Sequence, residues 1–286
     1  MNSKSPDSEK LKEEQKKNWG LAAVGWKKWW TTLESGAQVI SNLLVELARI
    51  KPGDKVMDVA TGIGEPAVTA ARIVGPSGCV VATDQSPQML AVAQERARAL
   101  ELSNMEFREM DGELLDLPEK PFDAVLCRWG LMFMPDRQSA LKSIRRHLAD
   151  GGRFAAAVWD VPQKVQSISL NVEILRKVLK APPPPEGAPG PFAMADTDAL
   201  KLSFEQAGFN NVQIERKTVT FAWPSADAYV QFTKDVSGHL KALMKDHPPQ
   251  LQAEAWEAVK EAVQKHAGPD GGISMRNQAI IVLGIC

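Results

Sequence analysis

A glycine turn between a strand and a helix is the strongest chemical signal in this sequence. The stretch from Val56 to Ala67 is an apolar run that leads into Gly62, Gly64 and Pro66. The two glycines allow a tight turn whose backbone can approach a ligand closely, and the proline suits the first turn of a helix. Asp84 follows Gly64 by 20 residues and ends a second apolar run, where a carboxylate can accept hydrogen bonds from both ribose hydroxyls. The spacing predicts a ligand that contains a nucleoside.

The glycine spacing by itself fits two kinds of cofactor. Gly62-x-Gly64-x-x-Ala67 also satisfies the dinucleotide fingerprint, with alanine in the third place. Asp58, at the end of the first strand, would repel a pyrophosphate but could hold the ammonium group of a methionine-like tail. The acidic element Asp111-Gly112-Glu113 follows the third predicted strand, where a carboxylate can accept a hydrogen bond from an adenine amino group. These features favour an adenosine cofactor with an amino-acid tail, and an NAD-dependent oxidoreductase stays as the alternative.

The sequence offers only weak candidates for a general base. His239 lies in a predicted insertion that could cover the ligand, and Asp160 follows the fifth predicted strand at its ligand-facing end. No cluster of Asp, His or Cys has the spacing of metal ligands, so we expect no metal. The three cysteines are odd in number and widely separated, which is typical of reduced thiols in a cytosol.

Alternating strands and helices would position these residues. The predicted strands are Lys55–Val59, Cys79–Thr83, Met105–Met110, Phe122–Cys127 and Arg153–Trp159. The predicted helices between them are Pro66–Val74, Pro87–Leu100 and Arg137–Ala149, the last one stopped by Asp150-Gly151-Gly152. Such alternation implies parallel βαβ units, so we predict a doubly wound α/β sheet.

Other segments flank this core. Leu11–Ile50 has a helical pattern and ends at Lys51-Pro52-Gly53. The proline-rich stretch Ala181–Pro191 is interpreted as an extended lid connection rather than a PxxP ligand. After it we predict a capped helix at Asp196–Ala207, a strand or pair of strand pieces at Asn211–Ala222, a helical insertion at Ser225–His266 and a closing strand at Ala279–Gly284. The predicted units are an N-terminal helical lid (1–50), a cofactor-binding core (51–160) and the rest of the sheet (161–286), with substrate-covering insertions at 161–195 and 225–270.

Composition argues against several classes of function. The chain has 286 residues, a net charge of -1 and a pI near 6.5, so it has no electrostatic reason to bind nucleic acid. The stretch Met1–Asn18 is rich in Lys and Glu and lacks the apolar core of a signal peptide or anchor. No run approaches the roughly 18 apolar residues of a membrane span. We expect a cytoplasmic protein that acts on a small molecule, with its oligomeric state open.

The motifs resemble those of the class I S-adenosylmethionine-dependent methyltransferases, within them the type 11 group that includes the ubiquinone and menaquinone biosynthesis methyltransferases. The resemblance covers Lys51–Asp160 strongly and Phe192–Val212 more loosely. It rests on five landmarks in family order: Asp58–Gly64, Thr83–Leu90, Met110–Glu113, Phe122–Cys127 and Leu148–Arg153. The family commonly has glycine where this chain has Ala60 or Thr61. The resemblance implies a Rossmann-like, mostly parallel seven-stranded sheet with an antiparallel last strand, N-terminal helices and helical lid insertions.

The resemblance also implies which residues bind S-adenosyl-L-methionine. Asp58 and the turn of Ala60, Thr61, Gly62 and Gly64 should hold the methionine part, and Asp84 the ribose. Gln85 and Met89 should line one side of the adenine, Asp111 and Gly112 its edge, and Cys127 and Arg128 should lie beside the sulfonium or its carboxylate. The implied activity is methyl transfer to an O, N or C nucleophile, and a catalytically inactive cofactor-binding protein is a further alternative.

The methyl acceptor is predicted to be a small apolar or aromatic molecule. Trp19, Trp26, Trp29 and Trp30 fall within twelve residues and could enclose it together with the insertions. Three of them, at i, i+3 and i+4, form one helical face that could equally serve packing.

Overall fold

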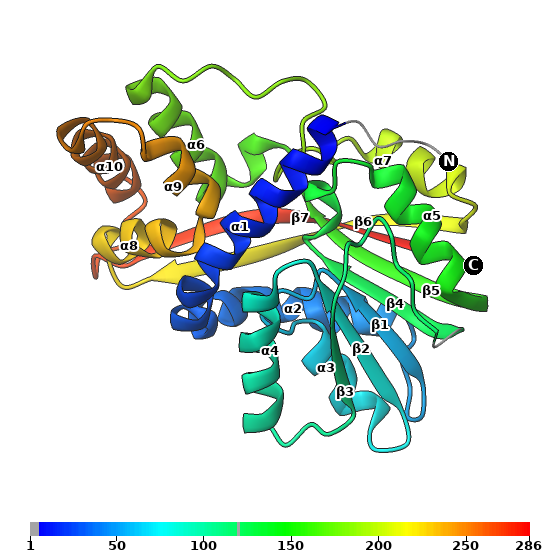
Figure 1. The fold of residues 1–286 in the computed structure, drawn as a ribbon. Coiled ribbons are helices and arrows are strands. Elements are labelled where there is room, and N and C mark those ends of the chain that lie inside the picture. The colour runs from blue at the N-terminus through cyan, green and yellow to red at the C-terminus, as the bar shows by residue number, and fades with distance from the viewer. Residues whose placement is uncertain (1–5, 119–120) are drawn as a thin grey trace.

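Seven strands form one mixed sheet in the computed structural model, which describes residues 6–118 and 121–286 (Figure 1). The order across the sheet is β3-β2-β1-β4-β5-β7-β6, and β7 is antiparallel to both of its neighbours. This arrangement confirms the predicted fold class. The strands are β1 (Lys55–Val59), β2 (Cys79–Asp84), β3 (Met105–Glu109), β4 (Phe122–Arg128), β5 (Leu148–Trp159), β6 (Asn210–Trp223) and β7 (Ile273–Ile285).

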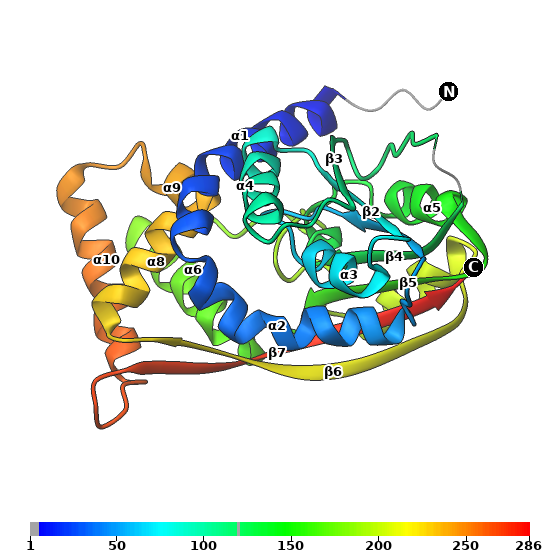
Figure 2. The ribbon, with the colours of Figure 1, turned by 90° about the horizontal axis from the view of Figure 1, so that it is seen from below.

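Helices cover both faces of this sheet (Figures 1 and 2). One face carries α2 (Trp30–Leu47), α3 (Ala67–Val74) and α4 (Pro87–Ala99), and the other carries α5 (Arg137–His147) and α7 (Thr197–Gln206). Local sequence explains where they begin: Ser86 caps α4 by accepting a hydrogen bond from the Met89 amide, and Pro87 occupies its first position. Asp196 caps α7 in the same way, as predicted.

The clearest differences from the predicted bounds are in one helix and three strands. Helix α5 ends at His147 and β5 begins at once at Leu148, so Asp150-Gly151-Gly152 does not stop the helix but lies within the strand. The pairing of β4 with β5 shifts there, from Phe122 opposite Leu148 to Ala124 opposite Arg153, which places these residues at a bulge. Strand β6 is continuous, and β7 begins six residues before the predicted Ala279.

The extra length of β6 and β7 carries a helical cap. Residues Thr218–Trp223 pair with Ile273–Gln278 beyond the end of β5, and the resulting ribbon projects past the sheet (Figure 2). Between these two strands lie α8 (Ala226–Val236), α9 (Gly238–Met244) and α10 (Pro249–Gln264). Helix α6 (Gln166–Leu179) joins them, because the Tyr229 hydroxyl on α8 donates to Asn171 Oδ1 at 2.8 Å. The predicted insertion at Ser225–His266 therefore contains three helices, which form a four-helix cap with α6 on an arm of the sheet.

Helix α1 (Pro6–Lys28) runs from the end of β3 to this cap (Figure 1). Gly25 lies so close to α8 that a Cβ would stand 2.1 Å from the Asp235 carbonyl oxygen. A Cβ added to Gly238 of α9 would likewise stand 2.3 Å from the Asn18 carbonyl oxygen of α1. No helix among the described residues has the length and apolar character to cross a membrane.

Helix α2 rests on β6 through a glycine, and this contact gives a test of the packing. A Cβ on Gly36 would lie 2.5 Å from the Thr220 carbonyl oxygen and 2.6 Å from the Phe221 ring. Gly36→Ala should therefore lower the free energy of unfolding by about 1–3 kcal/mol, because backbone and a packed ring must both shift. Gly190→Ala is the control, since a Cβ there meets none of the described residues within 4 Å. Urea unfolding that gave equal stability for both variants would contradict this packing.

Candidate functional site

The glycine turn lies at the carboxyl end of β1, and its two glycines have different roles. Gly62 has a φ of 57°, and a Cβ there would meet nothing among the described residues within 4 Å. Gly64 has a φ of 102°, and its Cβ would stand 3.3 Å from Ala93 Cβ on α4. Gly62 thus faces open space and Gly64 permits helix packing. Ala60 adopts a left-handed φ of 57° although it is not glycine. It is one of the two positions at which the sequence has another residue where similar proteins commonly have glycine.

Asp58 has a buried carboxylate with one oxygen available. Its Oδ2 accepts hydrogen bonds from the Thr61 hydroxyl at 2.6 Å and from the Ala67 amide at 3.0 Å. Its Oδ1 is buried and has no hydrogen-bond partner in the described part of the chain. Burial raises the pKa of Asp58 to about 7, although both hydrogen bonds and the charge of Arg128 act to lower it. An unpartnered buried acceptor is costly unless a donor from outside the chain completes it.

Asp84 ties the second strand to the turn. Its Oδ2 accepts from the Gly62 amide at 2.9 Å and its Oδ1 from the Ser86 amide at 2.9 Å. Burial raises the pKa of Asp84 to about 6 against these backbone hydrogen bonds. Each carboxylate oxygen keeps a further lone pair for a ligand. Gln85, beside it, is half-buried.

The acidic element after β3 is covered by α1. The Lys12 ammonium donates to Asp111 Oδ2 at 2.7 Å and also to Glu113 Oε2. The other oxygen of Glu113 accepts from the Asp136 amide, at the start of α5. Gly112 lies close to Met134, whose methyl group would be 2.5 Å from a Cβ. Lys12 was not identified from the sequence, because its partners lie about a hundred positions away along the chain.

The end of β4 contributes Cys127, Arg128 and Trp129. The Cys127 thiol is fully buried, and burial raises its pKa to about 12. The Arg128 guanidinium makes all of its hydrogen bonds to α2, including two with the Glu34 carboxylate at 2.7 and 2.9 Å. Trp129 has a left-handed φ of 60°, which is unusual for a bulky residue, and its ring stacks on Trp159 at 4.2 Å. Its buried indole N–H has no partner among the described residues.

The tryptophans of the N-terminal helices α1 and α2, with Trp29 between them, make contacts between helices. Trp26 donates to the Val236 carbonyl oxygen at 3.0 Å, and Trp29 donates to Asp235 Oδ2 at 2.8 Å. Trp30 packs against the Arg96 guanidinium. Trp19 packs in an apolar cluster with Ile63 of the turn and with Met89, so Met89 lies in a small core beneath α1. These contacts support the packing role that the sequence left open.

The two candidate bases have different surroundings. Asp160 is ion-paired with Arg216 at 2.9 Å and with Lys164 at 3.3 Å. Burial acts to raise its pKa, but hydrogen bonds from the Val161 amide and these two cations outweigh burial and hold the pKa below its usual value. Asp160 is thus a weak base. His239 has an exposed side chain on α9. The described residues contain no group of three or more His, Cys, Asp or Glu side chains that could hold a metal ion.

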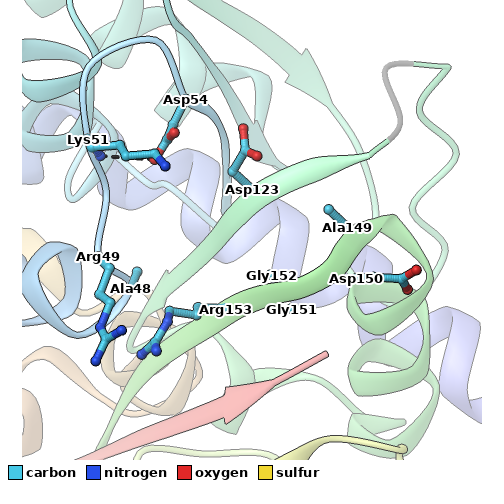
Figure 3. A pocket seen from close by; sticks show the side chains of 10 residues that line it. All are labelled: Ala48, Arg49, Lys51, Asp54, Asp123, Ala149, Asp150, Gly151, Gly152 and Arg153. Carbon is cyan, nitrogen blue, oxygen red and sulfur yellow. Dashed lines mark hydrogen bonds between the residues drawn. The ribbon is translucent and has the colours of Figure 1, made fainter.

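A surface hollow lies at the opposite ends of the strands from Asp58 and Asp84 (Figure 3). Its lining includes Arg49, Arg153 and Asp123, near the amino ends of β1 and β4. Parallel sheets bind ligands at the carboxyl ends of their strands, where Asp58 and Asp84 lie. This hollow is therefore separate from the candidate site.

The raised pKa of Asp58 predicts how stability depends on pH. A carboxyl that titrates at about 7 when folded, against 3.8 when unfolded, binds protons more tightly in the folded state, so stability falls as pH rises between these values. From about pH 4.5 to 7.5, Asp58→Asn should gain about 2–4 kcal/mol in unfolding free energy relative to the ligand-free wild type. Asp160→Asn should show no such gain over the same range, because the pKa of Asp160 is lowered and its contribution to stability changes only below the unfolded value of 3.8. Urea unfolding at about pH 4.5 and pH 7.5 measures these changes. The same trend with pH for the two variants would contradict the raised pKa of Asp58.

Comparison with known proteins identifies the family. A family model described as a methyltransferase domain matches residues 50–208, more than half of the chain. The chain is 33% identical over 120 residues to the ubiquinone/menaquinone biosynthesis C-methyltransferase UbiE of Teredinibacter turnerae, covering 42% of this chain and 48% of that protein. It is 29% identical over 185 residues to UbiE of Cronobacter sakazakii, covering 61% and 73%. The first match thus spans about half the length of the relative.

Solved structures share the fold. The YcgJ protein of Bacillus subtilis superposes with a TM-score of 0.57 at 18% identity, covering 86% of this chain and 97% of that one. The cyclase SpnF superposes with a TM-score of 0.53 at 20% identity, covering 87% and 80%. With the match of the family model and the sheet order described above, the chain belongs to the class I S-adenosyl-L-methionine-dependent methyltransferases.

Proposed function

We propose that this chain transfers the methyl group of S-adenosyl-L-methionine to a small, largely apolar or aromatic acceptor at the carboxyl ends of β1 and β4. The observation that carries the proposal is the unpartnered Oδ1 of Asp58, beside a turn in which Gly62 faces open space. A buried carboxylate oxygen without a donor fits an ammonium group, and the missing Cβ leaves room for the chain that bears it. The names of the UbiE relatives also favour a small-molecule acceptor.

The residues of the site fit the remaining parts of this donor. Asp84 would accept hydrogen bonds from the ribose hydroxyls through its free lone pairs. Gln85 would lie along the adenine, and Asp111 with Gly112 would meet the adenine edge once Lys12 shares or releases Asp111. Met89 and Arg128 have other partners in this structure, so we propose indirect roles for both. Cys127 would lie below the turn as a neutral thiol.

Alignment and exclusion of water are the main contributions expected from the protein. S-adenosyl-L-methionine supplies a methyl group on a positively charged sulfur and needs no further activation. The N-terminal helix and the cap would enclose the reacting groups, so that the acceptor atom meets the methyl group in line and without competing water. Asp160 is held as an ion-paired anion, and we therefore assign no general base.

The acceptor is expected to lie against Trp129 rather than against the tryptophans of the N-terminal helices. Gly130 follows Trp129, and a Cβ on it would stand 2.6 Å from Ala60 Cβ, so the backbone after Trp129 lies against the cofactor turn. The stacked pair of Trp129 and Trp159 offers an aromatic surface, and the unpartnered indole N–H offers one donor to a polar atom of the acceptor. This combination favours a flat molecule with one hydrogen-bond acceptor near its reacting position.

Gly62→Val tests the site of the donor. A branched side chain would fill the open space beside the turn and would also strain a left-handed backbone. The affinity of the variant for S-adenosylhomocysteine should therefore be lower by about 100-fold or more, which corresponds to the loss of several contacts. Calorimetric titration measures the affinity, and circular dichroism shows whether the fold is kept. Gly187→Val, at a φ of 75° in the proline-rich loop, is the matched control for backbone strain. A folded Gly62→Val protein with wild-type affinity would refute the proposed site.

The acceptor face can be tested with two probes of the same shape. 2-Naphthol and naphthalene differ only in a hydroxyl, which can accept a hydrogen bond from the Trp129 indole N–H. With S-adenosylhomocysteine bound, the affinity for 2-naphthol should be about five- to tenfold higher, because one hydrogen bond contributes about this much. Trp129→Phe should remove this preference, whereas Trp26→Phe, which loses a structural N–H, should keep it. Equal preference in the wild type and Trp129→Phe would exclude this role for the indole.

Turnover itself is tested by incubating the protein with labelled S-adenosyl-L-methionine and a metabolite extract and identifying the labelled product. Binding of S-adenosylhomocysteine without any labelled product would favour the alternative of an inactive cofactor-binding protein.

A further inference from the structure

Five buried charged side chains form a cluster behind the glycine turn, which we call the turn cluster: Glu34, Asp58, Glu65, Arg96 and Arg128. Their side chains are between 0 and 11% exposed. They come from α2, β1, the turn, α4 and β4, so the cluster connects the N-terminal helices with the sheet. Three carboxylates and two guanidiniums leave one negative charge uncompensated when all are ionised.

The cluster is built around the pair of Glu34 and Arg128. The two guanidinium nitrogens of Arg128 reach the two carboxylate oxygens of Glu34 at 2.7 and 2.9 Å. Ser41 Oγ accepts a further bond from Arg128 at 2.8 Å. A fork-to-fork pair with this geometry fixes both side chains. The end of β4 is thereby attached to α2.

A second pair continues the cluster under the turn. Glu65 accepts from the Thr69 hydroxyl at 2.7 Å and lies 3.7 Å from the Arg96 guanidinium. Arg96 in turn donates to the Ile63 carbonyl oxygen at 2.6 Å. The turn that bears Gly62 is thus held by charged groups on both sides.

Asp58 is the one carboxylate of the cluster with an oxygen open to a ligand. The titratable groups around it are Arg128 and Cys127 on β4, Glu65 in the turn and Asp84 on β2, with Glu34 of α2 and Arg96 of α4 behind them. Arg128 favours the charged form of Asp58, and Glu65 opposes it. Glu34 weakens the field of Arg128, because its carboxylate sits directly on the guanidinium.

We propose that Glu34 and Arg128 are positioning residues that act through Asp58, so that helix α2 sets the charge with which the turn binds the ammonium group of the methyl donor. This inference rests on the proposed function, in which Asp58 is the ammonium ligand. Its physical basis is that a cation in a buried site stabilises a neighbouring carboxylate, and that a second carboxylate on that cation partly cancels the effect. Neither residue needs to touch the donor.

Removing either member of the pair has opposite consequences. Without Arg128, the cation that favours the charged form of Asp58 is gone while the opposing charge of Glu65 remains, so Asp58 should ionise only at higher pH. Without the charge of Glu34, Arg128 acts on Asp58 with its full field, and Asp58 should ionise at lower pH. A purely structural role for the pair would weaken binding at every pH in both cases and would leave the midpoint of the pH profile unmoved.

The test is the affinity for S-adenosylhomocysteine as a function of pH, from about 5.5 to 8.5, measured by calorimetric titration. The wild type should bind more tightly as pH rises through about 7, where Asp58 ionises. Relative to that midpoint, Arg128→Met should shift upward by about one pH unit and Glu34→Gln should shift downward. The double variant should return towards the wild-type midpoint, since it removes one charge of each sign.

Two controls make the result specific. Arg216→Met removes a guanidinium paired with a different buried carboxylate, Asp160, and should not move the midpoint. In an Asp58→Asn background, Glu34→Gln should no longer shift the profile, although Asp84 still titrates there. If Arg128→Met fails to fold, the midpoints of Glu34→Gln and of the double variant test the inference instead.

Unmoved midpoints, shifts in the same direction, or a shift that survives in Asp58→Asn would overturn the inference. Failure of the wild type to bind S-adenosylhomocysteine at all would instead refute the proposed function.

Discussion

The candidate site depends on one constraint of the sheet, the divergence of the chain after β1 and β4. These strands are neighbours, but β1 continues through α3 towards β2 and β4 continues through α5 towards β5, on the opposite side. The connections therefore leave in opposite directions, and doubly wound sheets bind ligands at such a point. Asp58, the glycine turn and Trp129 lie at the carboxyl ends of β1 and β4 because they are the residues that end or follow these two strands. Their left-handed backbones at Ala60, Gly62 and Trp129 turn the chain away from the sheet.

Helix α1 is held beside these residues by specific contacts. Helix α1 is fastened at its beginning by the ion pairs of Lys12 and at its end by close backbone packing of Gly25 on α8. Between these points, Trp19 packs on Ile63 and Met89. The aromatic residues of α1 thus fasten this helix, while the stacked Trp129 and Trp159 follow β4 and end β5. A ligand bound at Asp111 would have to share its carboxylate with Lys12 of α1.

Burial of charge beneath the turn carries an energetic cost. Asp58, Asp84 and Glu65 all have raised pKa values, because each is removed from water and only partly compensated by hydrogen bonds and cations. Burial also opposes the charge of Arg128, but the adjoining carboxylates outweigh burial and raise its pKa. Such groups persist in proteins when other parts of the structure supply the stability, and they are often found where a ligand completes the arrangement.

Much of the fold was contained in the sequence. The alternation of strands and helices, the glycine turn and the acidic residues at strand ends are local patterns, and each correctly predicted an element within a few residues. The bounds that were wrong, at β5 and β7, depend on pairing: the bulge opposite Phe122 and the ribbon beyond β5 exist only because another strand provides the hydrogen bonds. The helical cap was predicted as an insertion, but not its attachment to that ribbon.

The roles of single residues were harder to predict, because they depend on partners that lie far away along the chain. Asp58 and Asp84 could be proposed as ligand groups from their position at strand ends alone. That Arg128 pairs with Glu34, that Lys12 covers Asp111, and that Trp129 stacks on Trp159 follows from contacts that only the packed structure creates. The sequence by itself determined the family and the sheet and predicted a place for the site, since short-range patterns of glycine, charge and apolar residues encode them. The tertiary structure decided which oxygen and which N–H stay unpartnered, because hydrogen bonding of buried groups is settled only when all surrounding elements have packed.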